Sequence, residues 1–137
     1  MARDKFHQEV KRALEKDGWT ITADPLYLKI GRFPIHIDLG AEKVFGAEKN
    51  GEKIAVEVKT FGLFSFITAF YEAVGKYLVY REALLEMNSP RVLYLAIPNA
   101  IYEEYCSEIL VQRIFSTHTF KIIIYDALTE TVVSWLK

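Results

Sequence analysis

The segment RVLYLAIP, residues 91–98, restricts the fold more than any other stretch of the chain. It is almost continuously apolar, which is typical of a strand covered on both faces of its sheet. A strand of this kind needs packing elements on either side. We therefore expect a central β-sheet that is flanked by helices.

The other patterns supply the remaining layers of that sheet. Apolar residues at helical spacing predict helices, and alternating residues or turn signals predict strands. The expected helices are 4–17 (capped by Asp4 and ended by Gly18), one running from Ser65 to about residue 87, and 100–115; the expected strands are two short pieces around a turn at Asp24-Pro25, 33–40, 43–49, 52–59, 91–98 and two at the C-terminal end. This order predicts one α/β (α+β) domain over residues 1–137, with a central mixed β-sheet flanked by helices.

The long helix has a repeating stripe that we expect to face the core. Its members recur at three- and four-residue steps and are apolar except for one arginine. They are Ile67, Phe70, Tyr71, Val74, Leu78, Arg81 and Leu85.

Composition limits where the protein works and what it binds. Seventeen basic and eighteen acidic residues give a formal charge of −1, so binding to nucleic acid would need a local patch or a metal ion. The single cysteine excludes an intrachain disulfide and fits a reducing cytoplasm. No segment approaches the roughly 18 apolar residues that span a bilayer, so we expect a cytoplasmic protein.

Two charged residues interrupt the apolar strand 52–59. Glu57 and Lys59 share one face, because side chains alternate along a strand. Together with Asp38 they fit the pattern Asp, spacer, Glu-X-Lys. Asp38, Glu57 and the carbonyl of Val58 could bind Mg²⁺ or Mn²⁺, and Lys59 could stabilise charge on a phosphodiester. The alternative is a weak, exposed ion pair on a strand face.

The turn signal at Asn50-Gly51 raises a difficulty for this site. If these two residues form the turn, the numbers of two residues that pair across the strands add up to 101. This places Glu42 opposite Lys59 and leaves Asp38 about 13 Å from the site. The chain would then have to bend between Asp38 and Phe45, at Gly40 or Gly46. Without a bend, Glu42 would replace Asp38 as the metal ligand.

Four blocks of sequence point to a family. DKFHQEVKRALEKDGWTITADPL, HIDLGAEK, IAVEVKTFGLFSFI and AVGKYLVYREAL, which cover most of residues 4–85, resemble the XisH-type family of excision controlling factors for the fdxN DNA element of cyanobacteria, removed during heterocyst development. The resemblance implies a restriction-endonuclease-like fold of the PD-(D/E)XK superfamily. It also implies that the protein acts on DNA with a site-specific recombinase and a small XisI-type partner.

The resemblance also assigns roles to individual residues. Asp38, Glu57 and Lys59 match the catalytic signature of the superfamily. His7 lies where relatives carry a polar residue on the first helix; it could steady a metal-bound water or contact phosphate, or simply pack there. Lys76 and Tyr80 match a Gln-x-x-x-Tyr pair, and because Lys76 departs from the usual Gln it puts full nuclease activity in doubt.

Three classes of function therefore remain open on the sequence. The first is a Mg²⁺- or Mn²⁺-dependent endonuclease, and the second is a catalytically silent regulatory module of the same fold that binds DNA or protein. The third is a purely structural interaction protein. The aromatic segment FGLFSFITAFY, residues 61–71, is either ordinary core or part of a surface for a partner or a homo-oligomer.

Overall fold

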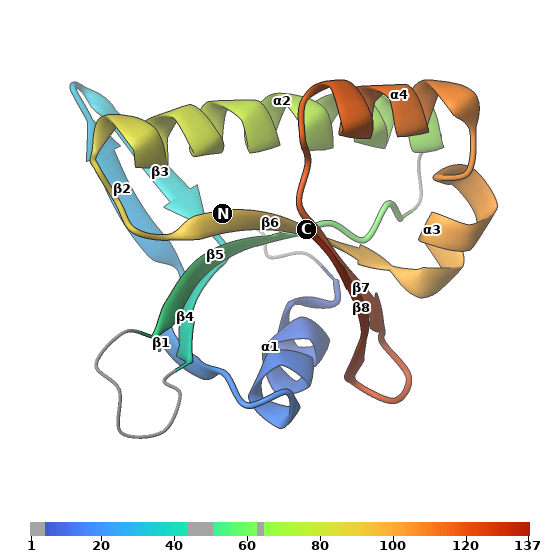
Figure 1. The fold of residues 1–137 in the computed structure, drawn as a ribbon, viewed down its shortest axis with the longest axis horizontal. Coiled ribbons are helices and arrows are strands. Elements are labelled where there is room, and N and C mark those ends of the chain that lie inside the picture. The colour runs from blue at the N-terminus through green and yellow to red at the C-terminus, as the bar shows by residue number, and fades with distance from the viewer. Residues whose placement is uncertain (1–4, 44–50, 63–64) are drawn as a thin grey trace.

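The computed structural model describes residues 5–43, 51–62 and 65–137 as a mixed sheet with helices on both faces (Figure 1). In chain order the elements are α1 (His7–Lys16), β1 (Thr20–Ala23), β2 (Leu26–Ile30), β3 (Phe33–Ile37), β4 (Leu39–Lys43), β5 (Glu52–Val58), α2 (Phe66–Glu86), β6 (Val92–Pro98), α3 (Asn99–Tyr105), α4 (Ile109–Thr117), β7 (Ile122–Asp126) and β8 (Thr131–Leu136). The predicted fold class is confirmed.

The six-stranded sheet has the order β1-β4-β5-β6-β7-β8. Its centre is parallel, with β6 between β5 and β7, and its outer pairs are antiparallel. Parallel neighbours need crossover connections, and α2 supplies one while α3 and α4 supply the next. The central strand β6 is the apolar segment that the sequence predicted to be covered twice, and all but its first residue are buried.

Each face of the sheet has its own core. On one face α1 packs against a cluster that includes Ile54, Val56 and Val58 of β5. On the other face α2 and α4 cover a cluster that includes Ala55 of the same strand. The alternation predicted for β5 is therefore confirmed, and Glu57 belongs to the face that α2 covers.

A separate hairpin lies on the α2 side of the sheet. Strands β2 and β3 pair only with each other, and Leu28 and Ile37 contribute to the α2 core (Figure 1). The prediction of one strand over 33–40 was wrong, because the chain leaves the hairpin at Asp38 and enters the main sheet at Leu39. Asp38 therefore occupies the bend between two sheets.

The helix limits follow their predicted signals in most places. Gly18 has φ +93, a left-handed conformation that favours glycine, and its N–H bonds the carbonyl of Glu15 as α1 ends. Ser65 accepts a hydrogen bond from the Thr68 N–H at the start of α2. The predicted helix 100–115 is instead two helices, and Cys106 ends the first of them. The predicted cap Asp4 lies outside the described residues.

The predicted stripe of α2 faces the core only in part, since Phe70 is buried and Val74 and Leu78 pack against the core. The residues that α2 buries are Phe70, Ala73, Tyr77, Ala83 and Leu84. In contrast, Ile67, Tyr71 and Leu85 are exposed. Apolar side chains surround most of this helix, so spacing alone did not identify its buried face.

Candidate functional site

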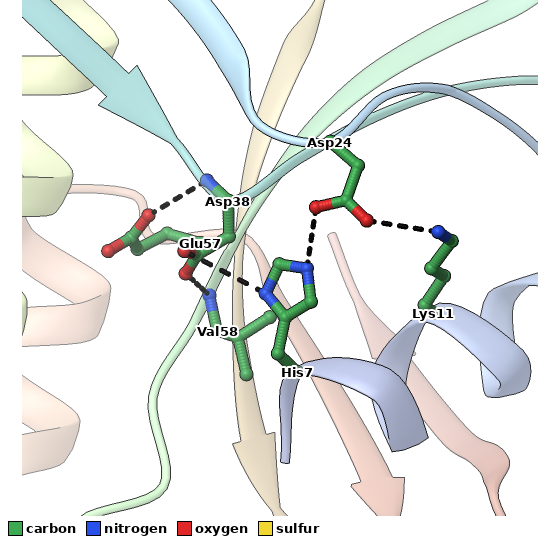
Figure 2. Close-up of polar contacts among 6 residues, drawn as sticks. All are labelled: His7, Lys11, Asp24, Asp38, Glu57 and Val58. Atoms are coloured by element: carbon green, nitrogen blue, oxygen red, sulfur yellow. Dashed lines mark hydrogen bonds and ion pairs between the residues drawn. The ribbon is translucent and has the colours of Figure 1, made fainter. Parts of the chain in front are cut away.

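Asp38 and Glu57 lie side by side where the bend between β3 and β4 meets the end of β5. The backbone N–H of Asp38 donates to Glu57 Oε1 at 3.3 Å, and the N–H of Val58 donates to Asp38 Oδ2 at 2.8 Å (Figure 2). The structure therefore brings together the two carboxylates that the sequence proposed as metal ligands.

The strand register explains this arrangement and corrects the hairpin arithmetic. Strands β4 and β5 pair Leu39 with Val56 and Lys43 with Glu52, so the numbers of two paired residues add up to 95 and not to 101. The same register continued by one residue sets Asp38 against Glu57. A two-residue turn at Asn50-Gly51 is incompatible with this pairing, and no bend between Asp38 and Phe45 is needed.

The alternative ligand Glu42 lies elsewhere on the sheet. It pairs with Lys53 across β4 and β5, and its carboxylate is 3.6 Å from the Lys53 ammonium. Gly40 has a different role from the bend expected of it, since its missing side chain makes room for the guanidinium of Arg91. Gly46, the other glycine proposed for a bend, lies outside the described residues.

Glu57 is buried and electrostatically unfavourable as an anion. Only 7% of its surface is exposed. Burial, followed by the neighbouring charge of Asp38, raises the pKa of Glu57 to about 8. A divalent cation between the two carboxylates would favour their ionised forms.

Two lysines predicted for the site, Lys59 and Lys76, are joined by an acidic residue of α2. Lys59 follows β5, and its ammonium is 3.1 Å from Glu72 Oε1, while the Lys76 ammonium is 3.3 Å from the same oxygen. The structure thus orients Lys59 toward Glu72. Lys76 acts on Glu57 electrostatically and lowers its pKa, against the larger effects of burial and Asp38.

The auxiliary residues of α2 lie within electrostatic reach of the pair. Burial by itself lowers the pKa of Lys76, but Glu57 and Glu72 outweigh it, so the pKa is raised. Tyr80 has a raised pKa, first because of burial and then because of Glu57, with a smaller effect from Asp38. Lys76 and Tyr80, which lie one helical turn apart on α2, thus both interact electrostatically with Glu57.

His7 approaches Asp38 from the α1 side. Its Nδ1 lies 4.0 Å from Asp38 Oδ1, and its Nε2 lies 2.7 Å from Asp24 Oδ1 (Figure 2). Asp24 also accepts a hydrogen bond from Lys11 at 3.0 Å. The sequence placed His7 at the site but missed Asp24 and Lys11. The only local signal was the turn at Asp24-Pro25, which carries no information about contact with α1.

Glu72 was also missed, although it precedes Lys76 by one helical turn, a spacing typical of ion pairs. Within the described ranges no three His, Cys, Asp or Glu side chains are grouped closely enough to surround a metal ion. A cation on Asp38 and Glu57 would thus need backbone or water oxygens as well. Val58 can supply one, because the N–H and C=O of a strand residue point to the same side and its N–H points at Asp38.

The aromatic segment 61–71 is divided between core and surface. Phe61 and Phe70 are buried, whereas Ile67 and Tyr71 are exposed beside a hollow that α4 also lines. Among the described residues, no helix has both the length and the apolar character needed to cross a membrane.

Comparison with known proteins identifies the family of the chain. A family model described as XisH protein matches residues 1–133. The crystal structure of an XisH family protein from Nostoc punctiforme PCC 73102 is 40% identical, with a TM-score of 0.88 and coverage of 98% of this chain and 100% of that one. That of an fdxN element excision controlling factor protein from Anabaena variabilis is 38% identical, with a TM-score of 0.88 and the same coverage. No curated protein matches the chain. With a family model that spans nearly its whole length and two solved structures of the same fold, the chain belongs to the XisH family.

Proposed function

We propose that this chain is an excision controlling factor for a DNA element and that it carries a divalent-cation-dependent nuclease site at Asp38, Glu57 and Lys59. The role in excision rests on the similarity to the Anabaena variabilis protein, whose name states that role. In this proposal the chain works in the cytoplasm with DNA, a site-specific recombinase and a small XisI-type partner. The fold is then a variant of the restriction-endonuclease-like, PD-(D/E)XK architecture.

One observation carries the proposal for chemistry. Asp38 and Glu57 are adjacent, Glu57 is 7% exposed, and its pKa is raised to about 8. A buried carboxylate beside a second, half-buried carboxylate weakens the fold unless a positive charge offsets their repulsion. The set of hard oxygen donors fits Mg²⁺ or Mn²⁺.

The residues of this chain would divide the work as follows. Asp38, Glu57 and the Val58 carbonyl would hold the cation, which when bound supplies stabilisation for negative charge on a phosphate oxygen. Lys59, released from Glu72, would place its ammonium against the same phosphate. Lys76 and Tyr80 would contact the DNA backbone from α2.

A second function is favoured by a specific observation. The ammonium of Lys59 is paired with Glu72, and only 17% of the Lys59 side chain is exposed. A lysine held in this way contributes to structure. The same cation site would then serve a regulatory module that binds DNA or protein without cutting.

Cleavage and binding assays separate the two functions. Supercoiled and branched DNA are incubated with the protein and Mn²⁺ or Mg²⁺, and cation binding is measured by calorimetry. We expect cleavage by the parent and by Glu42→Gln, whose carboxylate lies away from the site, and loss of cleavage in Asp38→Asn, Glu57→Gln and Lys59→Met. Cleavage that persists in Glu57→Gln or Lys59→Met would refute the nuclease site. Cation binding without cleavage would establish the regulatory module.

A further inference from the structure

His7 presents a buried nitrogen that has no hydrogen-bond partner in the described part of the chain. The side chain of His7 is 4% exposed, and its Nδ1 makes no hydrogen bond. Unsatisfied buried polar atoms are rare and costly in native proteins. This nitrogen points at Asp38 Oδ1, which is 4.0 Å away (Figure 2).

Asp24 determines which nitrogen of His7 carries the proton. The Lys11 ammonium donates a hydrogen bond to Asp24 Oδ2 at 3.0 Å, an ion pair in which Asp24 is a carboxylate. An ionised carboxylate can only accept hydrogen bonds. The Nε2 atom, 2.7 Å from Asp24 Oδ1, must therefore be the donor. In the neutral imidazole this leaves Nδ1 with a lone pair.

Two lone-pair atoms, His7 Nδ1 and Asp38 Oδ1, thus face each other across a short gap. Their separation of 4.0 Å is too long for a hydrogen bond. It is close to twice the distance of about 2.1 Å between a small divalent metal and its ligand atoms. The other oxygen of Asp38, Oδ2, already accepts a hydrogen bond from the Val58 N–H, which leaves Oδ1 the more open of the two oxygens to a cation.

We propose that His7 Nδ1 is a direct nitrogen ligand of the cation on Asp38 and that this ligand makes the site prefer Mn²⁺ over Mg²⁺. The proposal rests on the cation site of the proposed function and adds the identity of a ligand and of the metal. Mn²⁺ shares the oxygen ligands of Mg²⁺ but, as a transition metal, also accepts an imidazole nitrogen, whereas Mg²⁺ is bound through oxygen. Glu57 and His7 lie on opposite sides of Asp38, so in this arrangement Glu57 would hold the cation through one of the waters that such ions keep.

Asp24 and Lys11 act as positioning residues in this arrangement. Metal-binding histidines usually donate their second N–H to a carboxylate, which fixes the tautomer and the ring orientation. Asp24 does this for His7, and Lys11, at 3.0 Å, anchors Asp24 in turn. Loss of such an outer partner typically costs about 10- to 100-fold in metal affinity.

The decisive test needs no substitution. Pulsed electron paramagnetic resonance of Mn²⁺ bound to the full chain is compared between protein with ¹⁴N-histidine and protein with ¹⁵N-histidine. We expect a directly bound nitrogen whose coupling changes with the isotope. Bound Mn²⁺ without this coupling would overturn the proposal, including the case in which a water or a doubly protonated His7 fills the gap.

Variants then test the preference for the metal. Calorimetry with Mn²⁺ and with Mg²⁺ compares the parent with His7→Ala, Asp24→Asn and the control His36→Ala, whose histidine packs against Tyr27. We expect His7→Ala and Asp24→Asn to weaken Mn²⁺ binding about tenfold or more and to change Mg²⁺ binding far less. Equal losses for both metals would overturn the inference while leaving the oxygen site intact. Absence of any cation binding in the parent would overturn the proposed nuclease site as well.

Discussion

The buried carboxyl of Glu57 makes the stability of the fold depend on pH. Its pKa is raised to about 8, first by burial and then by Asp38, from an ordinary value of 4.5. The folded state therefore holds this proton more tightly than the unfolded state does. The stabilisation is fully present below pH 4.5, and it is lost as the pH rises toward 8.

The size of the effect follows from these two values. Between pH 4.5 and about 8, the folded state binds this one proton and the unfolded state does not, so the free energy of unfolding falls by about 1.4 kcal/mol for each pH unit of increase. The total over this window is about 5 kcal/mol. Small domains are stable by only about 5–15 kcal/mol. Ionisation of this single group is therefore a large fraction of the stability of the protein without a cation.

Urea unfolding followed by circular dichroism from pH 5 to 8.5, in the presence of a chelator, measures the effect. The variant Glu57→Gln keeps the shape of the protonated side chain but cannot ionise. We expect the free energy of unfolding of the parent to fall, relative to Glu57→Gln, by up to about 1.4 kcal/mol per pH unit within the window.

The difference between parent and variant isolates Glu57 from groups that act in the opposite direction. Asp24 and Glu72 have lowered pKa values despite burial, which by itself raises them, because hydrogen bonds donated by neighbouring side chains outweigh it. Their stabilisation is present at higher pH in both proteins and cancels. Parallel pH profiles for parent and Glu57→Gln would refute the reasoning, and Glu42→Gln should behave like the parent.

Two further predictions concern the packing around the sheet. Tyr77→Phe removes a buried hydroxyl that donates to the Leu93 carbonyl at 3.1 Å and accepts from the Lys121 N–H at 3.0 Å. We expect urea unfolding to show that the free energy of unfolding falls by about 1–3 kcal/mol. An unchanged urea midpoint would contradict the role of this hydroxyl in joining α2 to β6 and β7. Gly40→Ala would place a Cβ 3.0 Å from the guanidinium of Arg91, which is held by backbone carbonyls on β4 and β5. We expect the free energy of unfolding to fall by about 1–3 kcal/mol. If the substitution no longer destabilises the protein when Arg91→Ala is also present, the contact with Arg91 is the cause.

The pattern of apolar and polar residues predicted a large part of the fold correctly. The apolar run of β6 required cover on both faces, and α1 and α2 supply it. The alternation along β5 placed Glu57 on the face opposite Val56 and Val58. The first result depends on a continuous apolar run and the second on a repeat of two residues, and a short stretch of chain carries either pattern by itself.

Such patterns did not predict the register between strands or the face of a helix that is buried. The numbers of paired residues in β4 and β5 add up to 95, although the Asn-Gly turn signal predicted 101. The reason is that an Asn-Gly dipeptide indicates where a chain can reverse but does not determine which residues pair on either side of the turn. The stripe predicted for α2 was only partly correct, because apolar residues lie on most sides of this helix and packing against the sheet decides which of them are buried.

The sequence by itself determined the layers of this protein, the two acidic residues and the lysine of the candidate site, and the strand that carries Glu57 and leads into Lys59. Only the tertiary structure decided that Asp38 pairs with Glu57, that Glu72 holds Lys59, and that His7 reaches Asp38 with Asp24 behind it. The physical reason is the range of the contacts. A local repeat fixes which way a side chain points, but a meeting of residues from separate elements depends on register and helix packing, which the whole fold sets at once.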